Sequence, residues 1–360
     1  MDFDPDRRAM TVVLAIGTVK GGWTATSEDR RSWMVAGPFM KGWEVTAFGR
    51  SHAGDALLSA VSPWYGAAIH RSPDLETWTQ IVEGPAYAEE PERKLSRIWA
   101  LESAHGRTYA GVAKAGLFAS DDVESWTAVT GLNEHETRSA WGPGAGGLMT
   151  HRLLFDPERS DRMWCGISAV GVFRTDDGGE TWQAKNQGVA GTDPDSEFPE
   201  IGFCVHGLTA DPDDPNRIWR QDHAGVYRSE DGGDSWERIQ NGLPNESGFG
   251  FPVVRHHASG ALFLAPLESD EYRLPVGGAF GIYRSTDDGN SWHRSGDGWD
   301  GTPTYDGVLR GAMDCDQLDT PGVYYGTTGG TVGFSSDGGD SWDTLAVRFP
   351  RISSVRVLTA

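Results

Sequence analysis

Short apolar runs alternate with polar turns along the whole chain. Three clear examples are residues 171–174, 225–228 and 281–284, in which a glycine precedes a β-branched residue, an aromatic residue and an arginine. Each run is followed at once by an acidic turn that ends in tryptophan. Brief runs rich in β-branched and aromatic residues, bounded by glycine and aspartate, are typical of strands. The pattern therefore predicts a series of β-hairpins, and no stretch has the period of a long helix.

The acidic turns share one sequence pattern. Aspartate at the third position is expected to accept hydrogen bonds from backbone N–H groups of the turn. Glycine at the fifth position suits a positive φ, and the closing tryptophan is expected to pack into a core while the acidic tip stays in water. The pattern reads Ser/Thr, any residue, Asp, any residue, Gly, any residue, Ser/Thr, Trp at residues 175–182, 229–236, 285–292 and 335–342, with shorter copies at 27–33, 72–78 and 120–126.

The spacing of these turns predicts the fold. The closing tryptophans stand at positions 33, 78, 126, 182, 236, 292 and 342, so that neighbours are 45 to 56 residues apart. This period fits one four-stranded propeller blade for each copy. We therefore expect an all-β fold, a single seven-bladed β-propeller over residues 1–360, with no second domain.

Both ends of the chain are expected to contribute to the first blade. The residues before the first turn and those after the last turn together make one more repeat. We expect blade one to be shared between residues 10–36 and 351–360, with residues 352–358 as its inner strand. Such closure removes open sheet edges.

The repeated turns resemble Asp-boxes, the bacterial neuraminidase repeats of sialidases, sortilin-like proteins, xyloglucan-degrading hydrolases and photosystem assembly factors. The resemblance covers the whole chain and implies a β-propeller. It does not imply a typical sialidase, because those enzymes carry Arg-Ile-Pro near their start and this chain has only a scrambled run at residues 349–352. The xyloglucan hydrolases resemble two such propellers clamped together, and this chain has length for one.

The net charge narrows the choice of partners. Asp and Glu number 52 against 31 Lys and Arg, which gives a formal charge of −21. Such a charge repels nucleic acid and anionic membranes, so we expect neither as a partner. The three cysteines, Cys165, Cys204 and Cys315, are too few and odd in number for a disulfide framework and are expected to be buried thiols.

The apolar stretches of the sequence give an expectation for localisation. No stretch approaches the roughly 20 apolar residues of a membrane-spanning helix. Residues 11–19 form an apolar run after two arginines, which is similar to a short signal-peptide core but lacks a convincing cleavage site. We expect a cytoplasmic protein, with secretion as the alternative.

Candidate ligand-binding residues gather in loops expected on one face. In propellers of this type the inner strand begins at the binding face, and the acidic turns lie on the opposite face. Aromatic side chains with arginines around a funnel suit a sugar or another small polar ligand. The alternative is that the tryptophans cover loop cores. The candidate substrate-binding residues are Arg97, Arg255, Arg310, Trp64, Trp141 and Trp299.

The candidate catalytic residues are His151, His206, Asp222, His223 and Asp306. His151 and His206 each lie five residues before the aspartate of an Asp-Pro pair, so adjacent blades place them in the same phase. The two histidines could be ligands of a divalent metal, or a general base and its partner. The alternative is that each packs between two blades and forms a hydrogen bond with the backbone. No other cofactor is indicated. Asp222 and His223 together suit an acid–base group. The alternative is that Asp222 stabilises the turn in which it lies.

Two classes of function remain open. The first is a carbohydrate-active propeller, a glycoside hydrolase or lyase with its site in the central funnel and Asp222 or Asp306 as acid–base carboxylate. The second is a non-catalytic protein-binding or assembly scaffold. Glycosidase chemistry needs two carboxylates at a defined separation, which a sequence does not reveal. The fold alone hosts both classes.

Overall fold

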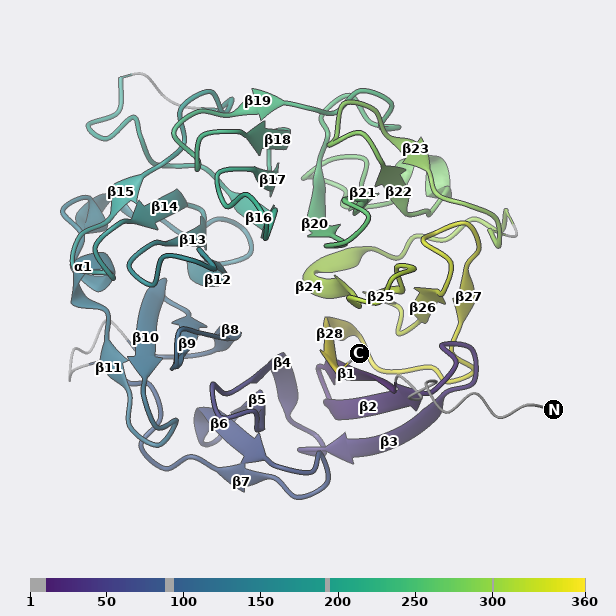
Figure 1. Ribbon diagram of the computed structural model, residues 1–360, viewed down its shortest axis with the longest axis horizontal. Helices are drawn as coiled ribbons and strands as arrows, with labels where there is room; N and C mark the ends of the chain where they lie inside the picture. The colour runs from purple at the N-terminus through teal and green to yellow at the C-terminus, as the bar shows by residue number, and fades with distance from the viewer. Residues whose placement is uncertain (1–10, 88–93, 192–194, 300, 360) are drawn as a thin grey trace.

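The computed structural model describes residues 11–87, 94–191, 195–299 and 301–359. Figure 1 shows small sheets arranged in a ring around a common centre. The described chain is almost entirely strand and loop, with one four-residue helix, α1 (Thr130–Asn133), and two 3-10 turns, Arg138–Ala140 and Val276–Gly278. None of its helices has the length and apolar character to span a membrane. The expectation of an all-β chain is confirmed.

Five sheets of the described chain have four strands each, in sequence order from the centre of the ring outward. Each sheet ends in a two-residue strand that follows an acidic turn. The strands are β4 (Glu44–Arg50), β5 (Ala56–Ser62), β6 (Gly66–Ser72) and β7 (Thr79–Gln80); β8 (Ile98–Ala104), β9 (Arg107–Val112), β10 (Gly116–Ser120) and β11 (Thr127–Ala128); β12 (Met149–Phe155), β13 (Met163–Ser168), β14 (Gly171–Thr175) and β15 (Gln183–Ala184); β16 (Val205–Ala210), β17 (Ile218–Asp222), β18 (Gly225–Ser229) and β19 (Glu237–Arg238); β20 (Gly250–Arg255), β21 (Leu262–Pro266), β22 (Tyr283–Ser285) and β23 (His293–Arg294).

A sixth sheet is different, because it has eight strands and contains both ends of the described chain. Its order is β27-β26-β25-β24-β28-β1-β2-β3. The last strand pairs antiparallel with the first, and a single parallel bridge, Gly311 to Ser354, joins it to β24. The strands are β24 (Val308–Cys315), β25 (Val323–Thr327), β26 (Val332–Ser335), β27 (Asp343–Thr344), β28 (Ile352–Thr359), β1 (Val12–Thr18), β2 (Gly21–Ser27) and β3 (Met34–Phe39).

The longer acidic turns have the expected hydrogen bonds. The Ser229 hydroxyl donates to the Asp231 carboxylate at 2.7 Å, and that carboxylate accepts the Ser235 N–H at 2.8 Å. The same Ser229 oxygen accepts the N–H of Gly233 at 2.8 Å. The fifth-position glycines have φ between +90° and +98°, and the closing tryptophans are at most 7% exposed, at Gly179, Gly233, Gly289 and Gly339 and at Trp182, Trp236, Trp292 and Trp342.

The three shorter turns differ in detail. Their fourth position is a non-glycine residue with positive φ: Arg30, Leu75 or Val123. Their closing tryptophans are only partly buried, at Trp33, Trp78 and Trp126. The fourth position of the longer turns also has a positive φ, at Gly178, Gly232, Asp288 and Gly338, but three of these four residues are glycines. The tryptophan of the shorter turn is less deeply covered.

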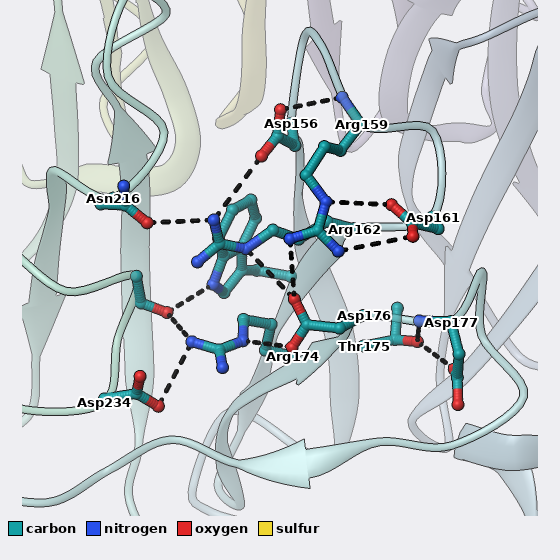
Figure 2. A network of polar contacts seen from close by, with 12 residues as sticks. Asp156, Arg159, Asp161, Arg162, Arg174, Thr175, Asp176, Asp177, Asn216 and Asp234 are labelled. Atoms are coloured by element: carbon teal, nitrogen blue, oxygen red, sulfur yellow. Dashed lines mark hydrogen bonds and ion pairs between the residues drawn. The ribbon is translucent and has the colours of Figure 1, made fainter.

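Neighbouring sheets are joined through these turns by a recurring arginine. Arg174, Arg228 and Arg284 each precede a turn and donate to a backbone carbonyl in the turn of the next sheet, at 3.0, 3.2 and 2.6 Å. Figure 2 shows Arg174 between Asp176 of its own turn and Asp234 of the next. The repeat therefore encodes contacts between sheets as well as within each sheet.

Apolar packing between sheets supplies the core. One cluster combines Trp164 of β13 and Val172 of β14 with Tyr227 and Trp236 of the next sheet. Trp164 is fully buried, and its indole N–H donates to the Gly232 carbonyl at 2.8 Å. Because each sheet buries its faces against two neighbours, the ring stacks sheets side by side and leaves the inner strands β4, β8, β12, β16, β20, β24 and β28 around the centre.

Candidate functional site

Each inner strand carries a register irregularity near its start. In β4, β8, β12 and β16 one residue has no partner on the neighbouring strand: Thr46, Trp99, His151 or His206. Longer irregularities include Phe251 in β20 and Arg310 in β24, and the pairing of β28 with β1 skips Ser353. Bulges of this kind turn a side chain away from the regular alternation. All seven of these side chains line one of two adjoining cavities at the centre of the ring.

The larger central cavity has a volume of about 570 Å³ and is lined by arginines. Four of them reach it: Arg152, Arg273, Arg310 and Arg351. Of the described residues that line it, Glu44 is the one carboxylate, and it already pairs with Arg97 at 2.9 Å. Aromatic side chains complete the wall, at Trp99, Phe251 and Tyr305. The cavity is therefore cationic although the whole chain is strongly acidic.

Arg310 lies at the junction of the two cavities, since it lines both. Its guanidinium carbon is 4.8 Å from the centre of the Phe251 ring, and its buried Nε has no hydrogen-bond partner among the described residues. Arg152 donates to the Arg310 carbonyl, and its own Nε is also buried without a partner. Burial lowers the pKa of Arg310 and lowers that of Arg152 to about 10. Both guanidinium groups line the larger cavity, and a guanidinium group is a good hydrogen-bond donor for an anion.

The smaller cavity, of about 260 Å³, brings together Cys204, His206 and His223. Cys204 Sγ and one nitrogen of each histidine all lie within 4.8 Å of one another. Nδ1 of His206 is 2.7 Å from the Gly250 carbonyl, and Nε2 of His223 is 3.0 Å from the Asp270 carboxylate. The cavity shares Arg273 and Arg310 with the larger one, so the two form a continuous site.

Burial and local charges set the protonation of these groups. Burial, with Arg310 nearby, holds the pKa of His151 and of His206 well below the ordinary value, so both imidazoles are neutral at pH 7. The thiol of Cys204 and then Asp270 raise the pKa of His223. Burial opposes ionisation of Cys204, but hydrogen bonds with His223 and Ser168 and the charge of Arg310 leave its pKa below the ordinary value.

The two histidines that the sequence placed together line different but adjoining cavities. His151 lines the larger cavity, and its Nε2 lies 2.9 Å from the Val205 carbonyl while its buried Nδ1 has no partner. His206 lines the smaller cavity and is grouped there with Cys204 and His223 instead. Each histidine also forms a hydrogen bond with a backbone carbonyl of the next sheet, as expected if the histidines pack between blades.

The two candidate carboxylates are not close to each other. Asp222 is 1% exposed and forms an ion pair with Arg220 at 2.5 Å, and it accepts the Ala224 N–H at 3.2 Å. Asp306 accepts the Thr327 hydroxyl at 3.2 Å and lines a separate cavity of about 460 Å³. Asp222 thus pairs within its own strand and turn although it lines the smaller cavity with His206, whereas Asp306 lines neither central cavity.

Among the candidate arginines, Arg310 alone lines the central cavities. Arg97 pairs with Glu44 at their rim. Arg255 pairs with Asp211 at 2.8 Å and packs over the ring of Trp219, so its charge is already neutralised between sheets.

The candidate tryptophans lie outside these cavities. Trp64 is 81% exposed at the β5–β6 turn, next to the equally exposed Tyr65. Trp141 is buried against Phe173 and Arg138, and Trp299 packs against Phe280 and Trp342 beside Asp306. Trp141 and Trp299 thus cover loop cores, which was the alternative interpretation.

Sequence reasoning missed Cys204, Arg152 and Arg273. Cys204 is only partly buried, unlike Cys165 and Cys315, which corrects the expectation that all three thiols are buried. Cys204 lies just before β16 and His206 stands at its bulge, so regular strand alternation does not predict that they meet, and their closeness in sequence was the one available signal. Arg273 lies on the insertion between β21 and β22, and no local pattern ties such a loop to the centre.

Comparison with known proteins identifies the fold. No family model and no curated protein matches this chain. Among solved structures, an ancestral GH74 enzyme matches 87% of the chain with a TM-score of 0.55 at 16% identity, although the match covers 38% of that enzyme. YCF48 bound to D1 peptide matches 84% of both chains with a TM-score of 0.53 at 14% identity. The WD40 β-propeller domain of Doa1 matches 88% of this chain and 86% of that chain, with a TM-score of 0.51 at 9% identity.

The chain is a β-propeller. At these identities the likeness shows the fold alone, and the matched proteins include both enzymes and binding proteins. The propeller must therefore be interpreted from its own cavities.

Proposed function

We propose that this propeller binds a small acidic carbohydrate in its larger central cavity and acts on it as a lyase-like enzyme. The observation that carries the proposal is the convergence of four arginines on a cavity of about 570 Å³ whose one lining carboxylate is already paired. A cavity of this size suits a ligand of one or two sugar units. Arginines recognise carboxylates through paired N–H donors, so an acidic sugar suits a cavity that four arginines line.

The aromatic side chains of the cavity support a sugar ligand. Trp99 and Phe251 stand at bulge positions of β8 and β20, two sheets that are not neighbours in the ring, and Tyr305 is 62% exposed. Aromatic faces offer the apolar contact that a sugar ring needs, while arginines and Thr46 offer polar contacts. This combination is the one expected of a carbohydrate site.

The lining favours elimination over hydrolysis. Glycoside hydrolysis needs a pair of free carboxylates that flank the bond, and of the described residues the cavity offers only Glu44. Elimination from an acidic sugar needs cations that stabilise the carbanion beside the carboxylate, and a neutral base. We assign that base to His151, a neutral imidazole that lines the cavity and whose Nε2–H bonds the Val205 carbonyl. Its Nδ1 is buried, so the ring must turn toward the cavity before Nδ1 takes a proton.

In this step Nδ1 of His151 takes the proton from the carbon next to the sugar carboxylate. The electron pair left behind forms a C=C bond as the neighbouring C–O bond breaks. The departing sugar oxygen takes a proton from water, and the product is an unsaturated acidic sugar. Arg310 and Arg152 stabilise the charge that develops on the carboxylate.

A thermal-shift and turnover assay tests the proposal. Oligogalacturonate and oligoglucuronate are expected to raise the melting temperature, whereas neutral glucose oligomers are not. Arg310→Gln should abolish the shift, and Arg31→Gln, on the exposed surface, should keep it. Turnover should give the ultraviolet absorbance of the unsaturated product and should be lost in His151→Gln with binding retained. Binding without product would reject the lyase step, and no shift with any acidic sugar would reject the site.

We also propose a blade count and an identity for the repeated turns. We take the eight-stranded sheet as two blades, β28-β1-β2-β3 and β24-β25-β26-β27, which makes seven blades over residues 1–360 with blade one built from both ends. The single bridge that joins these halves supports this count. We take the repeated turns as Asp-boxes, supported by their common hydrogen bonds.

A second candidate function is a non-catalytic protein-binding scaffold. The observation in its favour is the exposed aromatic pair Trp64 and Tyr65, at 81% and 85% exposure on one hairpin turn. Exposed aromatic residues of this kind are common in binding surfaces. If acidic sugars leave the melting temperature unchanged and Trp64→Ala lowers capture of a protein partner, this function replaces the first.

A further inference from the structure

We propose that Cys204, His206 and His223 bind one transition-metal ion of the zinc class in the smaller cavity. Their ligand atoms lie within 4.8 Å of one another, close enough for a small shift of the side chains to place all three on one ion. The metal needs no sugar to bind, so this inference stands apart from the proposed reaction.

The backbone holds the three residues together. Val205 pairs with Asp222 between β16 and β17, and the N–H of His223 donates to the Cys204 carbonyl at 3.1 Å. The bulge at His206 then turns this side chain to the same side as Cys204. His206 lies in β16, and Cys204 and His223 stand directly beside the paired ends of β16 and β17, where main-chain contacts hold them.

Each proposed ligand has an outer partner of the kind found at metal sites. His206 bonds the Gly250 carbonyl through Nδ1, which leaves Nε2 for the ion. His223 bonds the Asp270 carboxylate through Nε2, which leaves Nδ1. Ser168 lies 3.3 Å from the Cys204 sulfur. Metal-bound histidines almost always have their second nitrogen held by a carbonyl or carboxylate, and both histidines meet this condition.

The ligand set indicates the metal. One thiolate and two imidazoles suit zinc and are poor ligands for magnesium or calcium, which prefer oxygen. Three protein ligands leave a fourth position open, as in zinc sites that bind a water or a substrate oxygen. Arg310 and Arg273 line the same cavity. When the proposed acidic sugar occupies the larger cavity, one of its oxygens can take the fourth position on the metal. This last point alone rests on the proposed function.

A thiol nucleophile is the competing interpretation of the same residues. In this interpretation Cys204 is the nucleophile, His223 is its base, and Asp270 is the carboxylate that orients the base. That arrangement gives no role to His206, a buried side chain whose Nε2 belongs to the cluster. The convergence of a second imidazole favours the metal.

Metal content and thiol protection test the inference on the full-length chain. After treatment with a chelator and reloading with ZnCl₂, we expect one zinc per chain by elemental analysis. Cys204→Ser and His206→Gln should lose it, and the exposed His293→Gln should keep it. Asp270→Asn should weaken zinc binding by about 10- to 100-fold, as outer-shell changes do.

A measurement on the unmodified chain covers the case in which these variants fail to fold. Cys165 and Cys315 are buried, so iodoacetamide should reach Cys204 first. Added zinc should slow its alkylation by at least tenfold. A chain that takes up less than one tenth of an equivalent of zinc, or in which Cys204 reacts equally fast with and without zinc, overturns the inference and leaves the thiol nucleophile. These results do not depend on whether an acidic sugar binds.

Discussion

Nδ1 of His206 donates to the carbonyl of Gly250 at 2.7 Å, so the imidazole of β16 is anchored to β20 of the next sheet. This bond orients the ring and directs Nε2 away from Gly250. The same side chain occupies a bulge, which removes it from the strand alternation. One contact between sheets therefore positions a group of the central site, and the packing of the ring and the geometry of the site are physically coupled.

Arg228 is expected to stabilise the propeller by joining two sheets. Its Nη1 donates to the Asp288 carbonyl of the next turn at 3.2 Å. Arg228→Ala should lower the free energy of unfolding by about 1–2 kcal/mol, since a hydrogen bond to a charged group contributes about that much. Urea unfolding measures this loss of unfolding free energy. Arg31→Ala, on the exposed surface, is the matched control; equal stability of the two variants would contradict the prediction.

The acidic turns should make stability fall in acid. Hydrogen bonds from Thr181 and Ser291 lower the pKa of Asp177 and of Asp287 to about 2. A lowered folded pKa gives stability that is complete above the unfolded value near 4 and is lost as pH falls toward 2. Melting temperature should therefore drop between pH 4 and pH 2. The slope should be shallower in Asp177→Asn with Asp287→Asn, and should not change in the exposed Asp319→Asn.

The ion pair of Arg220 and Asp222 should be essential for folding rather than for chemistry. Both side chains are at most 2% exposed, and they are 2.5 Å apart. Arg220→Met leaves a buried carboxylate without its partner and should cost about 3–5 kcal/mol. Denaturant unfolding monitored by tryptophan fluorescence measures this loss. A variant that melts like the unmodified chain would return Asp222 to the list of candidate acid–base groups.

The last strand should be required for cooperative unfolding. β28 lies between β1 and β24, so deletion of residues 352–360 exposes edges of both halves of the eight-stranded sheet. We expect a broad, non-cooperative transition in calorimetry. The exposed Arg31→Gln variant is the control and should leave the transition sharp. An unchanged transition after removal of β28 would contradict the proposed closure of the ring.

Much of the fold could be predicted from the sequence, because its signals are local. The hydrogen bonds of the turn at residues 229–236 join groups at most a few residues apart, so the order of Ser, Asp, Gly and Trp is enough to specify them. The strands before the turns follow from alternation. The pairing of residues 352–358 with the first strand followed from the spacing of the repeats.

The central site was predicted only in part, because its groups meet across sheets. His206, His223 and Arg310 were identified as candidates, but their neighbours were not. Which side chain a bulge turns inward depends on how two strands pair, and Arg273 reaches the centre from an insertion. Asp222 looked available as a catalytic acid until the buried Arg220 two residues before it was seen to bind it.

The order of residues along the chain by itself determined the hairpins, their acidic turns and their repetition, since these depend on φ preferences and on hydrogen bonds between near neighbours. Only the tertiary structure decided that Cys204 and His223 gather around His206, and that the arginines surround one cavity. The physical reason is that burial and charge at a point depend on every strand packed around it, and several strands far apart in sequence contribute to the centre of this ring.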